Sequence, residues 1–211
     1  MLRPSVTRLK PRKSPLQARS ASSVDAILQA TIQVLLAVGR ERLTTTKVAH
    51  RAGVSVGTLY QYFPNKASLL QACLRRHLDS VAVAVEAACI TYRGQALAQM
   101  ASGVVNAFLE AKLRHLDASL ALYLISSQVE GAAIARENGL RCTKVVAEML
   151  ATAHEQLASD PEVVAATLLA SMAGVSRRLL ESPKPAENIE GTRHELVLLA
   201  TAYLEASGRA S

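Results

Sequence analysis

Hydrogen-bonding side chains are concentrated in the stretch TTTKVAHRAGVSVGTLYQYFPNK, residues 44–66. Hydroxyl, amide and ammonium groups at this density suit contacts with phosphate oxygens, and short side chains among them can reach the edges of bases. The candidate contact residues are Thr44, Thr45, Ser55, Val56, Gly57, Thr58, Tyr60, Gln61, Tyr62 and Lys66. The stretch therefore has the chemistry of a nucleic-acid contact.

These candidates differ in what they can contribute. Val56 and Thr58 are expected to read bases, through methyl contact with thymine or a hydroxyl hydrogen bond, and Gln61 offers the one amide. The Lys66 ammonium begins the next helix, where a phosphate can bind. Phe63 is expected to lie in the core.

Two short helices must position these side chains. Thr44 is an expected N-cap for a helix over 45–52, and Gly53 suits the turn that follows because it tolerates positive φ. Ser55 is an expected cap for a second helix, which Pro64 ends. The sequence thus predicts a helix-turn-helix motif over 44–63, whose second helix can enter a DNA major groove.

Charge is distributed unevenly along the chain. The net charge is +7, yet residues 1–66 hold eleven Lys and Arg against two acids, whereas residues 67–211 carry a small acidic excess. Residues 1–21 have six of these cations, three prolines and no hydrophobic periodicity, and we expect a disordered basic arm. This asymmetry favours a polyanion-binding site in the first third of the chain. A solvated basic tail would also account for part of the positive charge.

The same stretch resembles the DNA-binding signature of the tetracycline-repressor (TetR) family of bacterial transcription regulators. The matching residues are Thr44, Val48, Ala49, Ala52, Gly53, Val54, Ser55, Gly57, Thr58, Tyr60, Tyr62, Phe63, Lys66 and Leu69. Departures are slight: Val48 stands where Ile is commoner, Tyr62 where His is frequent, and Lys47 where an acid is frequent. The likeness covers about residues 22–70 and implies a DNA-binding domain over 22–68, with Tyr60 and Tyr62 contacting the DNA backbone.

The remaining residues, 69–211, read as helical throughout, so the expected fold is all-α with about nine helices. Breaks are expected near Gly94, Arg114, Gly131, Asn138–Gly139, Asp160–Pro161 and 182–188. The resemblance implies a ligand-binding and dimerisation domain here, in which the last two helices, about 161–181 and 192–206, form a four-helix bundle with a second subunit. Small residues in the first of these helices also suit an ordinary buried core, and that alternative stays open.

Four polar residues, His115, Tyr123, Ser127 and Gln128, are candidates for the pocket of a small-molecule effector, although ordinary core or surface positions are open for each. The effector is expected to be mostly apolar.

The sequence contains no residue pattern typical of a metal site or of an enzyme active site. Cys73 and His77 share a helical face, yet no further His or Cys lies at ligand spacing, so no metal or other cofactor is expected. No phosphate-binding loop or nucleophile motif is present, so an enzyme is not expected. Three widely spaced cysteines and the absence of an apolar leader favour a reducing cytoplasm.

The sequence therefore predicts a sequence-specific transcriptional regulator, acting as a homodimer on a near-palindromic double-stranded operator and released as a repressor by its effector. An effector-independent DNA-organising protein is the alternative. A helical lipid or drug carrier with an incidental basic arm is a third class, which specific DNA binding would exclude.

Overall fold

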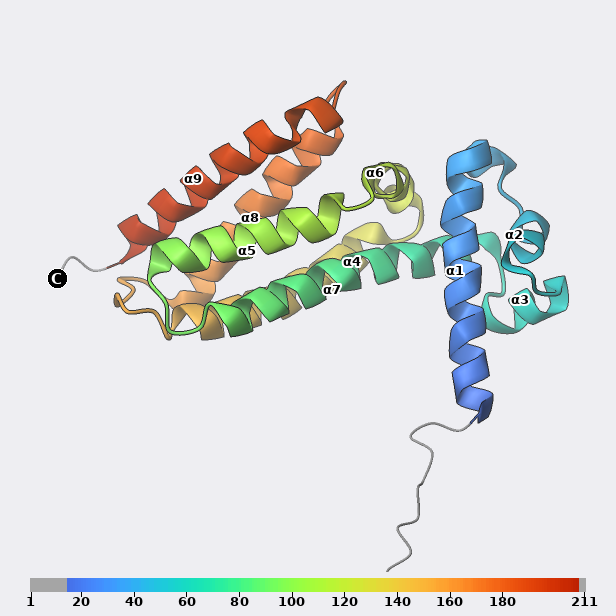
Figure 1. The fold of residues 1–211 in the computed structure, drawn as a ribbon, viewed down its shortest axis with the longest axis horizontal. Coiled ribbons are helices and arrows are strands. Elements are labelled where there is room, and N and C mark those ends of the chain that lie inside the picture. Colours follow the sequence, from blue (N-terminus) through green and yellow to red (C-terminus); the bar gives the residue numbers. More distant parts are fainter. Residues whose placement is uncertain (1–14, 209–211) are drawn as a thin grey trace, which may run out of the picture. The chain divides into compact units, whose positions relative to one another are not determined.

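The computed structural model describes residues 15–208, and within them the chain forms α-helices and two short 3-10 helices, with no named strand (Figure 1). The elements are α1 Pro15–Arg42, α2 Thr45–Ala52, α3 Val56–Tyr62, α4 Lys66–Thr91, α5 Leu97–Leu113, α6 Leu116–Ile125, η1 Ser126–Gln128, α7 Gly131–Leu150, α8 Pro161–Leu180, η2 Ala186–Asn188 and α9 Ile189–Ser207. The all-α fold with about nine helices is confirmed. The chain divides into two compact units, Met1–Leu69 and Leu70–Ser211.

Helix α1 begins earlier than the sequence indicates. The expected start was Ser22 or Ser23, but the helix begins at Pro15, so residues 15–21 of the expected disordered arm are helical. Proline fits the first helical position because the N–H that it lacks has no partner there. The rest of the expected arm, residues 1–14, lies outside the described residues. Gly39, where the helix was expected to stop, interrupts α1 with a non-helical φ of 72° and ψ of 167°, and the helical assignment resumes up to Arg42.

The first unit has its own small core. Helix α1 packs against α2, and α2 packs against α3. Their buried apolar side chains include Ile27, Leu35, Leu43, Val48, Ala49, Leu59 and Phe63. Phe63 therefore belongs to the core, as expected, and the apolar faces of the short helices fix which of their residues remain in solvent.

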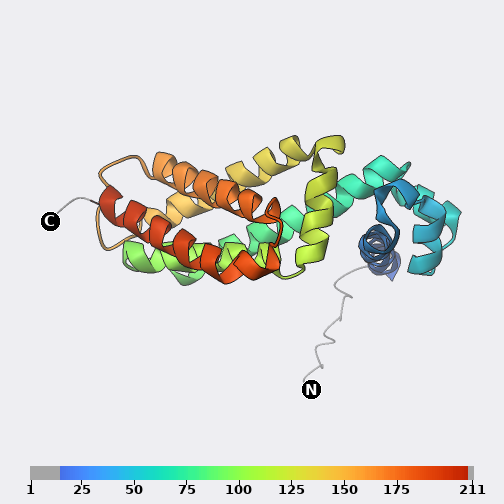
Figure 2. The same cartoon turned by 90° about the horizontal axis from the view of Figure 1, so that it is seen from above.

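The second unit is a bundle of α5 to α9 with most of α4. Helices α5 and α9 pack side by side, as do α7 and α8, and α8 lies beside α9 (Figure 2). Ion pairs join α4 to α7: Nε and Nη2 of Arg141 donate to the two carboxylate oxygens of Glu86, at 2.6 and 2.7 Å, and Arg75 contacts Glu137 at 2.7 Å. These pairs are largely exposed, so the buried apolar core must supply most of the stability.

The break expected at Asn138–Gly139 is wrong, because α7 runs without interruption from Gly131 to Leu150. The Asn138 amide donates to the Ile134 carbonyl at 3.3 Å, which keeps this buried side chain within its own helix. Ile134, Cys142 and Val146 bury the same face of α7. Burial of that face outweighs the weak local preference of an Asn-Gly pair for a turn.

Two helices, Ser20–Arg42 of α1 and Pro161–Leu180, are long and apolar enough to cross a membrane by length and composition. The core helices of folded proteins meet the same criteria. Both contribute fully buried side chains to the cores of their units, for example Ile27 and Leu168.

Candidate nucleic-acid interface and pockets

The two short helices are capped as their sequence predicts. Thr44 Oγ1 accepts a hydrogen bond from the Lys47 N–H at 3.3 Å, and Ser55 Oγ accepts one from the Thr58 N–H at 3.0 Å. Gly53 lies between the helices with φ 69° and ψ 29°, a left-handed conformation that glycine adopts without strain. Hydroxyl caps and one glycine thus fix the turn of this motif.

One face of α3 is exposed. Val56, Gly57, Tyr60 and Gln61 lie in solvent, with 37% of Val56 and 48% of Tyr60 accessible, whereas Leu59 on the opposite face is fully buried. The exposed residues recur at the helical spacing of one stripe. An apolar group, an approachable backbone, a phenol and an amide therefore share a single surface.

Thr58 and Tyr62 are less available than the sequence indicates. Both are partly buried, and the Thr58 hydroxyl lies 2.8 Å from Ser55 Oγ in a hydrogen bond within the N-terminal cap. Thr58 thus stabilises the start of α3. The groups of α3 that remain open to a base edge are those of Val56, Gly57 and Gln61.

A hydrogen bond between Tyr60 and Thr45, 3.0 Å from oxygen to oxygen, joins α3 to α2. This pairing could not be predicted from the sequence, because the two residues lie fifteen positions apart. Both hydroxyls keep further hydrogen-bonding capacity, so the pair can hold the two helices together and still contact a phosphate.

Lys66 has an intramolecular partner. Its ammonium donates to the Arg40 carbonyl at 2.5 Å, just after the break in α1 at Gly39. Lys47 donates similarly to the Arg42 carbonyl at 2.9 Å. An ammonium has three N–H donors, so each lysine can hold this corner and retain two donors for a phosphate.

A cavity of about 380 Å³ lies within the second unit. Its lining comes from α4 to α8 and η1, and comprises Leu74, His77, Leu78, Lys112, Ser119, Leu122, Tyr123, Ser126, Ser127, Gly131, Ala132, Ala135, Ala173, Arg177 and Leu180. Tyr123 and Ser127, two of the expected pocket residues, are among them. The volume lies within the range of small-molecule pockets.

The other two expected pocket residues do not fall there. His115 is exposed and lines a different cleft, of about 720 Å³, with Arg76, Asp79 and Ser80. The side chain of Gln128 lies outside the described part of the chain. The sequence missed Lys112 as a pocket residue, because a lysine one turn after Phe108 looks like an ordinary exposed helix position.

Burial shifts the titration of two basic groups in the 380 Å³ cavity. It lowers the pKa of His77 to about 4, an effect that the nearby Lys112 and His115 increase. It lowers the pKa of Lys112 to about 8. His77 is therefore neutral at pH 7, whereas Lys112 remains mostly protonated.

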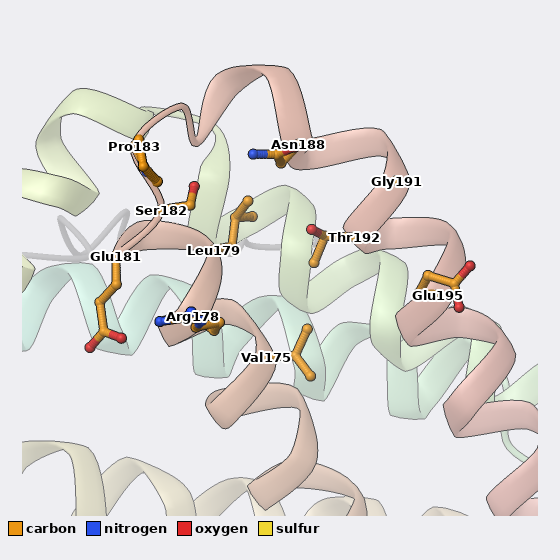
Figure 3. A pocket seen from close by; sticks show the side chains of 10 residues that line it. All are labelled: Val175, Arg178, Leu179, Glu181, Ser182, Pro183, Asn188, Gly191, Thr192 and Glu195. Carbon is orange, nitrogen blue, oxygen red and sulfur yellow. The ribbon is translucent and has the colours of Figure 1, made fainter.

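A third cleft, of about 530 Å³, lies where the end of α8 meets the start of α9 (Figure 3). Val175 and Arg178 line it from α8, and Thr192 and Glu195 line it from α9. Ser182 in the connecting loop has a buried hydroxyl without a hydrogen-bond partner in the described structure.

The cysteines are buried thiols. Burial raises the pKa of Cys89 to about 12 and also raises the pKa of Cys142. Neither thiol supplies a thiolate at neutral pH. Among residues 15–208, no three His, Cys, Asp or Glu side chains gather as a metal site would require, and His77 lines the cavity instead.

Two family descriptions match the chain in two separate segments. Residues 27–73 match "Bacterial regulatory proteins, tetR family", and residues 96–204 match "Tetracyclin repressor-like, C-terminal domain". The first contains the helix-turn-helix. The second spans α5 to α9 and contains every residue of the cavity lining except those of α4.

Curated relatives match over a short segment. The HTH-type transcriptional repressor KstR of Mycolicibacterium smegmatis is 44% identical over 55 residues, which are 26% of this chain and 27% of KstR. The nucleoid occlusion factor SlmA of Haemophilus ducreyi is 36% identical over 67 residues, 29% of this chain and 33% of SlmA. The similarity thus spans between a quarter and a third of these relatives.

Solved structures match over most of the chain. A TetR-family regulator structure from Mesorhizobium loti has a TM-score of 0.69 at 18% identity and covers 90% of this chain and 99% of its own. A transcriptional regulator from Rhodococcus sp. RHA1 has a TM-score of 0.67 at 22% identity, covering 90% and 100%. These structures share the fold, and the C-terminal description alone covers more than half of the sequence. The chain belongs to the TetR family of bacterial transcriptional regulators.

Proposed function

We propose that this regulator is a homodimeric repressor that reads a near-palindromic operator with α3 and leaves it when a small, mostly apolar effector occupies the 380 Å³ cavity. Regulators of this family bind DNA, which agrees with the expectation that the chain is not an enzyme. The observation that carries the proposal is the exposed stripe of α3, Val56, Gly57, Tyr60 and Gln61, on a helix whose opposite face is buried.

The stripe suits direct reading of bases. Val56 can pack against a thymine methyl, and the Gln61 amide can form two hydrogen bonds with adenine. Gly57 allows close approach of the backbone. Thr44, Thr45, Ser55, Tyr60, Tyr62 and Lys66 are proposed phosphate contacts, which fix the orientation of α3 without choosing the sequence.

A helix of seven residues reaches only a few base pairs, so specificity requires two half-sites about one helical turn apart. The proposed dimer forms through α8 and α9. Exposed apolar or small residues recur along α8 at Val163, Ala166, Ala170 and Gly174, with 58% of Val163 accessible.

On α9, Leu198 and Leu199 are 57% and 45% exposed, an unusual position for neighbouring leucines unless a partner covers them. Two other small residues of α8 are not part of the proposed dimer interface. Ala165 is fully buried in the core of its own chain, and Ala173 lines the cavity.

Release by an effector is supported by the course of α4. This helix is continuous from Lys66, whose ammonium binds Arg40, through Leu74, His77 and Leu78, which line the cavity. A ligand that prefers one position of α4 over another would change DNA affinity by its differential affinity for the two states, typically about 1–3 kcal/mol.

The name of one relative supports a repressor role. KstR is named a transcriptional repressor, and we extend that role to this chain. Action in the cytoplasm is part of the same proposal. SlmA is named a nucleoid occlusion factor, which keeps the effector-independent, DNA-organising function as the alternative. The cavity favours the effector-responsive repressor.

Selection of bound duplexes from a random pool tests the proposal. We expect enrichment of a near-palindrome, and at least one compound from a diverse small-molecule set should weaken binding to it. Enrichment without any responsive compound would favour the DNA-organising alternative, and no enrichment would contradict sequence-specific reading.

A further inference from the structure

The most distinctive side chain of the 380 Å³ cavity is Lys112, near the end of α5. Its ammonium lies 5.3 Å from the centre of the Phe108 ring. Within residues 15–208 it makes no ion pair, and the lining of the cavity contains no Asp or Glu. Its charge is therefore balanced only by an aromatic face and by solvent.

An ammonium in this position is unfavourable for the folded protein. Burial is the cause that lowers the pKa of Lys112, and no acid opposes that effect. Placing an unpaired charge in an apolar cavity costs free energy that an opposite charge would recover. The other strong cation of the lining, Arg177, already has the Glu181 carboxylate 3.9 Å away, so Lys112 is the cation that most lacks a counter-ion.

The backbone of Lys112 is anchored at the end of α5. Ser119 Oγ donates to the Lys112 carbonyl at 2.5 Å and lies 3.1 Å from the His115 carbonyl, which ties the end of α5 to α6. The side chain therefore starts from an anchored backbone, and its ammonium lies over the Phe108 ring.

The rest of the lining is mainly hydrocarbon. Leu74 and Leu78 come from α4, Leu122 from α6 and Leu180 from α8, and three alanines also line the cavity. The hydroxyl of Tyr123 already has a partner, because it donates a hydrogen bond to the Glu181 carboxylate. Lys112 is thus the one cationic group of the lining without an acidic partner in the part of the chain that the structure describes, and it faces a wall that is mostly apolar.

We propose that the cavity binds a small organic carboxylate with an apolar body, and that Lys112 is its counter-ion. This inference rests on the proposed function, because it identifies the chemical class of the effector. An aliphatic acid and an aromatic acid both present the required chemistry. The uncharged alcohol of either shape lacks it.

Calorimetric titration of the full chain separates these ligands. The probes are octanoate with octanol, and 2-naphthoate with 2-naphthol, each pair matched in its apolar body. We expect one of the acids to bind roughly tenfold or more tightly than its alcohol. A preference within the octanoate pair would indicate an aliphatic ligand, and a preference within the naphthoate pair would indicate an aromatic one.

Two variants localise the effect. Lys112→Met should abolish the preference for the acid and leave the alcohol affinity within about twofold, because methionine keeps the apolar stem. Its Tm should not fall, since the substitution removes an unpaired partly buried charge. Lys144→Met, at an exposed lysine of α7, should behave as wild type.

The proposal is overturned if alcohols bind as tightly as acids, if Lys112→Met keeps the preference, or if none of the four probes binds at millimolar concentration. Operator affinity, measured with and without the bound acid, tests the proposed function separately. An acid that binds through Lys112 without changing operator affinity would support the ligand assignment and contradict its role as an effector.

Discussion

At the scale of residues, the helix-turn-helix divides between hydroxyl groups that hold it together and the side chains of Val56 and Gln61, which face solvent on α3. Thr44, Ser55 and Thr58 use their hydroxyls in caps, and Tyr60 pairs with Thr45. The residue types alone identified all of these residues as candidates, but the sequence could not show which of them hold the motif together and which face solvent. That separation depends on which face of α3 the core covers.

The division leads to a prediction for base reading. Gln61→Ala and Val56→Ala should each change the preferred base at one position per half-site by about 1–3 kcal/mol, because these side chains face the groove in the proposed docking. The salt dependence of binding should stay nearly constant, since no phosphate contact is lost. Titration against single-base operator variants measures both quantities.

Gln29→Ala, at an exposed position of α1, is the matched control and should bind as wild type. A uniform loss of affinity across all operator variants for Gln61→Ala would show that this amide contacts the backbone and not a base.

Lys66 is expected to serve both folding and binding. Lys66→Ala removes the hydrogen bond to the Arg40 carbonyl, and the free energy of unfolding should fall by about 1–3 kcal/mol. If the remaining donors contact phosphate, the salt slope of a dimer should also fall by about 1.8. Urea denaturation and salt titration of the same variant measure the two effects. An unchanged unfolding free energy would contradict the structural role.

At the scale of elements, boundaries were predictable where side chains cap or glycine breaks the helix. Gly39, Gly53 and Asp160 mark such boundaries, and the Asp160 carboxylate caps α8 by accepting from the Glu162 N–H at 2.9 Å. The sequence was wrong at Asn138–Gly139, where burial of one face of α7 outweighs local preference. Such burial depends on residues far away in the sequence.

Two glycines of the motif should respond in opposite ways to alanine. Gly53→Ala should lower the free energy of unfolding by about 1–2 kcal/mol, because its φ of 69° is unfavourable for an L side chain. Gly57→Ala should leave stability unchanged or raise it by up to about 1 kcal/mol, since its Cβ would meet only Ser55 Oγ, at 3.7 Å.

The two variants should rank in the opposite order by operator affinity. Folded Gly53→Ala should bind normally, whereas Gly57→Ala should bind more weakly, because its methyl group projects from the exposed face of α3. Thermal denaturation together with operator titration checks both variants. Normal binding by Gly57→Ala would mean that the α3 backbone does not approach DNA closely.

At the scale of the whole molecule, composition indicated helices and charge indicated one polyanion-binding end. The cavity was harder to predict. Its lining comes from five helices and a 3-10 turn, so Lys112 and Leu74 meet only through the fold, and two of the four expected lining residues do not place a described side chain there. A pocket of this kind has no local sequence pattern.

The proposed dimer depends on the exposed leucines of α9. Leu198→Glu should raise the dimer dissociation constant by at least about tenfold, because a two-fold interface would bury two unpaired carboxylates. Leu140→Glu is the matched control: this leucine of α7 is 68% exposed and lies outside the proposed interface. Sedimentation over a concentration series measures both variants. Equal dimer dissociation constants for the two variants would show that the interface does not include Leu198.

The central claim is that a dimer reads a specific duplex, and the most direct test is anisotropy titration of three labelled duplexes at fixed salt. These are the selected near-palindrome, one half-site, and a scrambled sequence of equal length. The account predicts two chains on the palindrome, bound about 10³-fold or more tightly than the scrambled duplex, with the half-site clearly weaker than the palindrome. Affinities within tenfold of one another for all three duplexes would contradict it.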